Sequence, residues 1–389
     1  MFTLRRHMTH VLIGANLLMC ALFSCHAYAQ VETLTVNSSL FHEAAQFSVA
    51  LPNSYETNAS KSYVVLLDLH PRAQAYLTGM HDWMSHNGEW PWLETIIVTP
   101  PDGHQGLGQL KTAAIEEHGN EKLLDFMERD LLPAIDKRYR TNGFRILNGF
   151  TGNAGLSLYT LLNRPQLFNA YFAASPVLSE DFAFVMKDAP QKLKSMKGKP
   201  RFLFMSTSDS DFEQKQLADF AQLEAQVIAN APSTLRYQIK RFDGSYYMTQ
   251  PILATAHAIE MVFNDVHQVL EPDSAISQQG VQAILQHFKR LSEDQYGFTV
   301  SAVDSLLALG QSHEAGQLDK AIEVYQQTIA AYPKAHDAYH ALARAYDAQG
   351  LRAQAIKFEQ LALENTEHPF FQHKYRQQLA TFQGEAHPL

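Results

Sequence analysis

The chain has 389 residues, of which 46% are hydrophobic and 18% are charged, and its formal net charge is −9. This composition is ordinary for a folded globular protein, and the length allows two domains. The negative charge, with no basic cluster along the chain, argues against nucleic acid as a partner.

Residues 1–29 have the features of a secretory signal peptide. Arg5 and Arg6 precede an apolar stretch from Val11 to Phe23, and Ala27-Tyr28-Ala29 is a small-x-small cleavage site. The apolar stretch is too short for a membrane-spanning helix. We therefore expect an exported protein, either periplasmic or extracellular. Lipidation at Cys25 is a less favoured alternative, because Phe23 fits a lipoprotein signal poorly.

Both cysteines of the chain, Cys20 and Cys25, lie in this segment. Cleavage after Ala29 leaves a mature chain without thiols, which excludes disulfides, thiolate metal sites and a cysteine nucleophile. It also removes two positive charges from the net charge of −9, which becomes −11. The stability of the mature chain must then come from a sizeable core.

Strands and helices alternate from residue 30 to about residue 275. Apolar runs predict buried strands, and the segment from Gly119 to Tyr139 has the period of an amphipathic helix that Pro133 could kink. The expected strands are 34–41, 47–52, 63–70, 95–100, 144–150, 201–206 and 237–242, with one more at the stretch 166–176. This alternation is typical of a doubly wound, mostly parallel α/β sheet.

The most informative stretch runs from Phe144 to Tyr159. An apolar strand ends in the small residues Gly149-Phe150-Thr151-Gly152-Asn153 and then continues as an apolar helix. In α/β-hydrolases such a turn carries Gly-x-Ser-x-Gly, with the nucleophile at its apex. Here the apex is Thr151, and Asn153 stands at the second glycine position.

Residues 32–270 resemble the putative esterase family, which includes esterase D and the enterochelin (siderophore) esterases. The resemblance rests on a Leu-Pro-x-x-Tyr turn, on the helix before the nucleophile and on the strand that follows it. These motifs are Leu51-Pro52 with Tyr55, Asp125 to Thr141, and Pro165-x-Leu167-Phe168 with Ser175-Pro176. The resemblance implies an α/β-hydrolase domain over residues 30–275.

The same resemblance places the family's catalytic residues. The serine falls on Thr151, and the histidine of the turn after the last strand falls on Tyr247. The acid should follow the strand that ends at Met205, so either Asp209 or Asp211 takes its place. Leu69, Gly152, Asn153 and Tyr246 are the expected members of a ligand or oxyanion pocket, since backbone N–H groups at a helix N-terminus can hold an anion or a carbonyl oxygen.

These replacements matter because imidazole must remove the proton of the attacking hydroxyl group. A tyrosine with a pKa of about 10 is a poor acceptor at neutral pH. His70, at the end of a central strand, is the best alternative base by position, whereas His104 and His118 are more often solvated loop residues. No His, Asp or Glu spacing matches a metal motif, and we expect neither a metal nor a cofactor.

After residue 275 the strands stop and a repeat begins. Gly316-Gln317-Leu318-Asp319-Lys320-Ala321-Ile322 is echoed 34 residues later by Gly350-Leu351-Arg352-Ala353-Gln354-Ala355-Ile356. A period of 34 residues is the signature of tetratricopeptide repeats. We expect residues 276–389 to be a helical tail with about two such repeats.

Three functions remain open at this point. The first is a weakened or inactive esterase that serves in ligand binding or as a scaffold. The second is an active carboxylic-ester hydrolase that uses Thr151 with a non-standard base. The third is an assembly protein that acts through its repeats. A small ester- or acyl-like molecule is the expected ligand, and a protein partner would bind the tail.

Overall fold

The computed structural model describes residues 30–86 and 91–384. The expected signal peptide, residues 1–29, lies outside the described residues. The chain divides into two compact units, Met1–Thr141 and Asn142–Leu389. Each unit is described in turn, and the expected boundary near residue 275 stays a prediction.

The first unit contains four strands, in the order β1-β2-β4-β3. β1 pairs antiparallel with β2, β2 antiparallel with β4, and β3 parallel with β4. All residues of β3 and β4 are buried, which explains their continuous apolar sequences. The strands and their covering helices are β1 (Gln30–Val36), β2 (Ala45–Leu51), β3 (Tyr63–Asp68), α2 (Ala73–His86), β4 (Thr95–Thr99) and α3 (Gln105–Glu116).

The helix expected from Gly119 to Tyr139 is present but not uniform. It consists of α4 (Lys122–Phe126), the π-helical turn η2 (Met127–Leu131) and α5 (Leu132–Arg138). Pro133 lies at the start of α5, directly after the π turn. Because proline has no N–H to donate and its ring crowds the preceding turn, the irregularity falls where the sequence predicts it.

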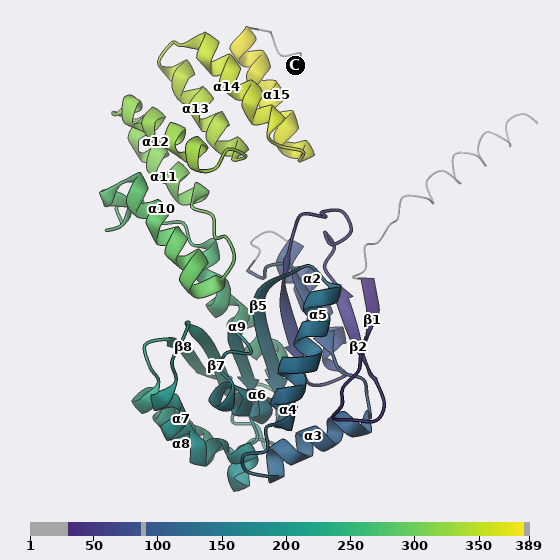
Figure 1. Cartoon of the computed structure of the whole chain (residues 1–389). Coiled ribbons are helices and arrows are strands. Elements are labelled where there is room, and N and C mark those ends of the chain that lie inside the picture. Colours follow the sequence, from purple (N-terminus) through teal and green to yellow (C-terminus); the bar gives the residue numbers. More distant parts are fainter. Residues whose placement is uncertain (1–29, 87–90, 385–389) are drawn as a thin grey trace, which may run out of the picture. The chain divides into compact units, whose positions relative to one another are not determined.

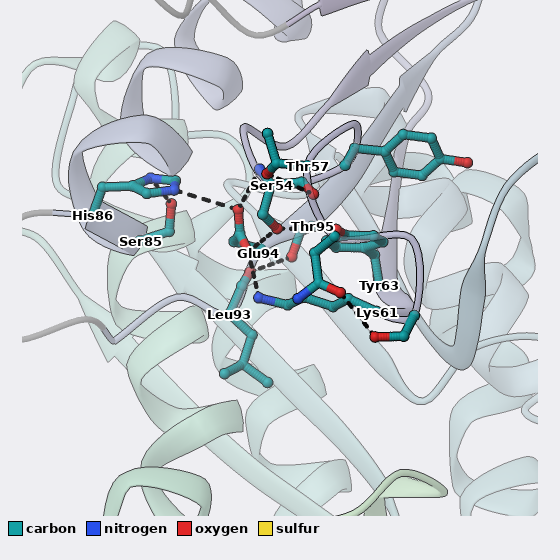
Figure 2. Close-up of polar contacts among 12 residues, drawn as sticks. Ser54, Thr57, Lys61, Tyr63, Ser85, His86, Leu93, Glu94 and Thr95 are labelled. Atoms are coloured by element: carbon teal, nitrogen blue, oxygen red, sulfur yellow. Dashed lines mark hydrogen bonds and ion pairs between the residues drawn. The ribbon is translucent and has the colours of Figure 1, made fainter. Parts of the chain in front are cut away.

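A polar cluster around Glu94 joins three segments of the first unit. Figure 2 shows Ser54, Lys61 and His86 converging on the Glu94 carboxylate. Ser54 donates from its backbone N at 3.1 Å and from its Oγ at 2.5 Å. Burial alone would raise the pKa of Glu94, but the hydrogen bonds from Lys61 and Ser54 outweigh it and lower that pKa to about 2. The cluster therefore holds the loop before β3, the end of α2 and the start of β4 together.

In the second unit, four parallel strands lie side by side in chain order, as Figure 1 shows for β5, β7 and β8. Their inward residues are large and apolar, and α9 packs against β6 and β7. The elements are β5 (Thr141–Phe150), α6 (Gly152–Asn163), β6 (Ala170–Ala174), α7 (Val185–Ser195), β7 (Arg201–Thr207), α8 (Leu217–Asn230), β8 (Leu235–Arg241) and α9 (Gln250–His267).

The helical region that follows begins inside the core of the second unit. After α10 (Val281–Arg290), the π turn η6 (Leu291–Tyr296) ends at Tyr296, whose ring packs on Phe144 at 5.7 Å and on Phe202 at 6.1 Å. The Tyr296 hydroxyl donates to the Val262 carbonyl oxygen at 2.7 Å. The start of this region is therefore built into the sheet's core.

Five further helices complete the chain. They are α11 (Val303–Glu314), α12 (Leu318–Ala331), α13 (His336–Ala348), α14 (Arg352–Glu364) and α15 (Pro369–Gln383), and each packs on the next. Small residues permit close approach: a Cβ on Gly310 would lie 2.2 Å from the Tyr325 ring. The all-α tail is confirmed, whereas the assignment of its helix pairs as tetratricopeptide repeats stays a prediction.

These elements confirm the expected fold class. The chain forms a mostly parallel α/β sheet of eight described strands with helices, followed by helices alone. Within the described ranges, no helix has the length and apolar character that a membrane span requires.

Candidate functional site

The turn between β5 and α6 has the backbone of a nucleophile elbow. Thr151 has φ 54° and ψ −119°, a conformation that is strained for a β-branched residue. Its N–H donates to the Ala174 carbonyl oxygen at 3.0 Å, and its own carbonyl oxygen accepts from Val177 N at 3.2 Å. These bonds from the segment after β6 hold the turn in place.

The two positions that are glycine in the Gly-x-Ser-x-Gly motif are Gly149 and Asn153 here, and the backbone requires glycine at the first of them only. A Cβ on Gly149 would lie 2.4 Å from the Asn153 carbonyl oxygen, so only glycine fits there. Asn153 lies within the first turn of α6 and is not among the residues with positive φ. The backbone at position 153 therefore does not require glycine, and the replacement leaves the elbow intact.

Tyr247 lies against Thr151, and its assignment as the counterpart of the family's histidine stays a prediction. The two side chains are hydrogen-bonded to each other. The Tyr247 ring is half-buried between Phe150, at a centroid distance of 4.9 Å, and Phe212, which stacks on it at 5.2 Å. A tyrosine hydroxyl thus lies beside the hydroxyl of the apex residue.

The surroundings of Tyr247 keep its hydroxyl protonated. Burial raises the pKa of Tyr247 above its ordinary value and has the largest effect; the hydrogen bond with Thr151 lowers it by less, and the charge of Glu213 raises it by the least. A phenol in this state can donate a hydrogen bond but cannot accept a proton at neutral pH. The pair therefore places two protonated hydroxyl groups side by side.

The two expected acids do not contact this pair in any described interaction. Asp209 is exposed and accepts from Gly244 N at 2.7 Å, so it joins the loop after β7 to the turn after β8. Asp211 is also exposed. Their roles as triad acids stay predictions.

Glu213 is the carboxylate that sequence reasoning missed. Its side chain is buried and accepts hydrogen bonds from Thr207 Oγ1 at 2.9 Å, Ser208 N at 3.2 Å, Ser208 Oγ and Ser210 Oγ at 3.2 Å. It is also the acid whose charge acts on Tyr247. The signal in the sequence is the group of hydroxyl residues Thr207, Ser208 and Ser210 shortly before a glutamate, because a buried carboxylate needs hydrogen-bond donors.

The expected pocket residues Gly152 and Tyr246 flank the pair. Gly152 opens α6 directly after Thr151. A Cβ on Gly152 would lie 3.6 Å from the Phe182 ring, whereas one on Gly155 would clash with that ring. Tyr246 is 84% exposed and directly precedes Tyr247. The roles of Gly152 and Tyr246 in a ligand pocket stay predictions.

Leu69 and His70 belong to the first unit, and their place beside Thr151 stays a prediction. Their shared peptide group is held at both ends: Lys111 Nζ donates to the Leu69 carbonyl oxygen at 2.5 Å, and the His70 N–H donates to Asp68 Oδ1 at 2.7 Å. His70 Nδ1 accepts from Arg72 N at 3.1 Å. Burial, Lys111 and Arg72 lower the pKa of His70, which keeps its ring neutral.

His104 has a structural role in the first unit. Its Nδ1 accepts from Leu107 N at 3.1 Å and caps α3, while its Nε2 lies 3.1 Å from the Glu43 carbonyl oxygen. Both ring nitrogens are thus engaged with the backbone. Across the described part of the chain, no group of three or more His, Cys, Asp or Glu side chains could hold a metal ion.

Comparison with known proteins identifies the family. Residues 38–233, half of the chain, match the family model described as Putative esterase. The chain belongs to this family, whose fold and elbow were described above. The comparison with curated proteins gave no match.

Solved structures share the fold over most of the chain. An uncharacterised protein from Capnocytophaga ochracea has a TM-score of 0.65 and 16% identity, covering 91% of this chain and 100% of its own. An IroE-like serine hydrolase from Shewanella oneidensis has a TM-score of 0.58 and 18% identity, covering 87% of this chain and 100% of its own. At these identities the likeness shows the fold alone.

Proposed function

We propose that this chain is an exported esterase-family protein with weakened or lost hydrolytic activity, and that it binds a small ester- or acyl-like ligand at the elbow. The observation that carries the proposal is the hydrogen bond between Thr151 and Tyr247. A hydroxyl group stands where a base would have to accept a proton. The strained turn supports a retained binding geometry, because the strain persists without a base to use it.

The size of the expected loss follows from the chemistry. Removal of a triad member typically lowers kcat by about 10⁴–10⁶. Thr151 retains a hydroxyl group, but its methyl group crowds the apex of the turn. We therefore expect hydrolysis close to the background rate, with ligand binding at the Thr151 and Tyr247 hydroxyls preserved.

The test is hydrolysis of short p-nitrophenyl esters by the mature protein, beside a Thr151→Ala variant. We expect both to give the same slow rate. A fast rate that Thr151→Ala abolishes would refute the proposal. In the converse experiment, Thr151→Ser combined with Tyr247→His should gain activity, since it returns a serine and an imidazole to positions that are already in hydrogen-bond contact.

An active hydrolase using Thr151 with His70 as its base is the second candidate. The observation in its favour is the lowered pKa of His70, which leaves a neutral imidazole able to accept a proton. A fluorophosphonate probe distinguishes the two candidates. Labelling of Thr151 that His70→Ala abolishes would favour the active enzyme, and absence of labelling favours binding alone.

An assembly role through the tail is the third candidate. We propose that α11 to α14 form two tetratricopeptide repeats, which is supported by their sequential packing and by the buried core around Tyr325 and Leu342. Removal of residues 300–389 should then abolish binding of a protein partner. Undiminished binding by the shortened chain would contradict this candidate.

A further inference from the structure

Three large apolar side chains next to the elbow are exposed to solvent. Phe212 is 79% exposed, Tyr246 is 84% exposed and Met248 is 70% exposed. They come from the loop after β7 and the turn after β8, on either side of Tyr247. We call Phe212, Tyr246, Tyr247 and Met248 the aromatic surface. Such a group of exposed apolar side chains marks a binding site more often than it marks ordinary surface.

Two rings of the aromatic surface pack on each other, and one of these packs on Phe150. Phe150, at the end of β5, packs on Tyr247, and Tyr247 stacks on Phe212 with an interplanar angle of 25°. The hydrogen bond to Thr151 fixes the Tyr247 hydroxyl. The outer ring therefore rests on two others, and a ligand would not have to order it.

The two segments that carry these rings are rich in acidic residues. Four carboxylates lie on the same two segments, Asp209, Asp211, Glu213 and Asp243, against the basic side chains Lys215 and Arg241. Arg241 is already held by Asp243 through two hydrogen bonds at 3.0 and 2.9 Å. The excess negative charge favours a cation and opposes an anion. A cation over an aromatic face gains further from the ring's quadrupole.

From these observations we infer that the aromatic surface binds a small hydrophobic cation, such as an ammonium group that carries an apolar substituent. The inference rests on the proposed function, since it names the ligand class for a site that binds without hydrolysis. A small molecule fits better than a protein, because a stable protein interface buries about 800 Å² on each partner and the exposed apolar part of this surface consists of the side chains of Phe212, Tyr246 and Met248.

The experiment is a titration of the mature protein with benzyltrimethylammonium, followed by ligand-observed NMR, beside benzenesulfonate, which has the same ring and the opposite charge. We expect saturable binding of the cation and none of the anion. Phe212→Ala should weaken binding at least about threefold through loss of one ring face. Asp211→Asn should weaken it in low salt, with the difference shrinking as salt is added.

Phe370→Ala is the matched control, because Phe370 is an exposed aromatic residue of α15 and should not affect binding. Equal binding of cation and anion, absence of saturable binding, or an unchanged affinity in Phe212→Ala would overturn the inference. Binding of a Lys-Leu peptide without binding of the small cation would overturn the choice of a small molecule. Ester hydrolysis, measured on the same samples, tests the proposed function separately: hydrolysis dependent on Thr151 refutes that function whatever the titration gives.

Discussion

At the scale of single residues, the elbow is the place where local preference and structure conflict most. Thr151 adopts a positive φ that β-branched residues rarely take. The residue type favours an extended backbone, but the hydrogen bond from Thr151 N to the Ala174 carbonyl oxygen and the one from Val177 N to the Thr151 carbonyl oxygen hold the turn. The sequence could indicate this turn only through its small neighbours, because the energy that holds it comes from β6.

The strain at Thr151 predicts an unusual order of stability. Thr151→Ala and Thr151→Gly both remove the hydroxyl and methyl groups, but only glycine adopts this backbone without strain. We expect Thr151→Gly to be the more stable variant, with a free energy of unfolding about 1 kcal/mol higher than that of Thr151→Ala in urea denaturation. A glycine variant less stable than the alanine variant would contradict the strain.

A second residue-scale prediction concerns His81. Its ring is buried, and its Nε2 accepts from Thr95 N at 2.9 Å. Burial and the neighbouring His86 lower the pKa of His81 from 6.5 to about 4. As the pH falls, His81 therefore binds a proton in the unfolded chain at a higher pH than in the folded chain. The contribution of the neutral, buried ring to the free energy of unfolding is complete above pH 6.5 and is lost as the pH falls toward 4.

The measurement is the free energy of unfolding against pH, beside His81→Gln, which does not titrate. Between pH 6.5 and 4 the native chain should lose about 3 kcal/mol more than the variant. Parallel curves for the two proteins would show that the pKa of His81 is the same in the folded and unfolded chains.

At the scale of elements, Glu94 joins segments that are far apart in the sequence (Figure 2). Glu94→Gln removes the negative charge that pairs with Lys61 and His86. This substitution should lower the free energy of unfolding by about 1–2 kcal/mol. Glu260→Gln is the control, because Glu260 forms an exposed contact with His257 and should change stability by less than about 0.5 kcal/mol. An equal effect of both substitutions would argue against the cluster.

The tail offers a second test at this scale. His340 and Glu359 form a buried pair at 2.9 Å, at the positions where the preceding 34-residue unit has Leu306 and Tyr325. His340→Ala leaves a buried carboxylate without its partner and should cost about 3–5 kcal/mol in thermal or urea unfolding. The double variant His340→Leu with Glu359→Tyr should restore most of that stability. A double variant as unstable as His340→Ala would contradict the repeat alignment.

The elements were predictable to different degrees. The central strands were found because all of their residues are buried, which gives continuous apolar runs such as Tyr63–Asp68. The segment Ser179–Phe184 was not found, since Glu180, Asp181, Ala183 and Phe184 all have positive φ and no local signal predicts such a run. Glu213 was missed because its importance depends on burial, which charge patterns do not reveal.

At the scale of the whole molecule, the chain after residue 29 contains no cysteine. Its stability therefore depends on the packed interior, in which large aromatic side chains such as Trp92, Tyr171 and Tyr296 are almost completely buried. A reducing agent should leave the Tm of the mature protein unchanged in calorimetry. A lower Tm in dithiothreitol would mean that the cysteines near the N-terminus remain and are bridged.

The contact between Thr151 and Tyr247 has an evolutionary consequence. Threonine and serine codons differ by a single nucleotide, and so do those of tyrosine and histidine. Two point mutations in the gene would thus supply a serine and an imidazole to a turn that already has their geometry. Under the proposed function, a population carrying this gene is two steps from an active esterase, and selection on ester-containing nutrients is where such variants would arise.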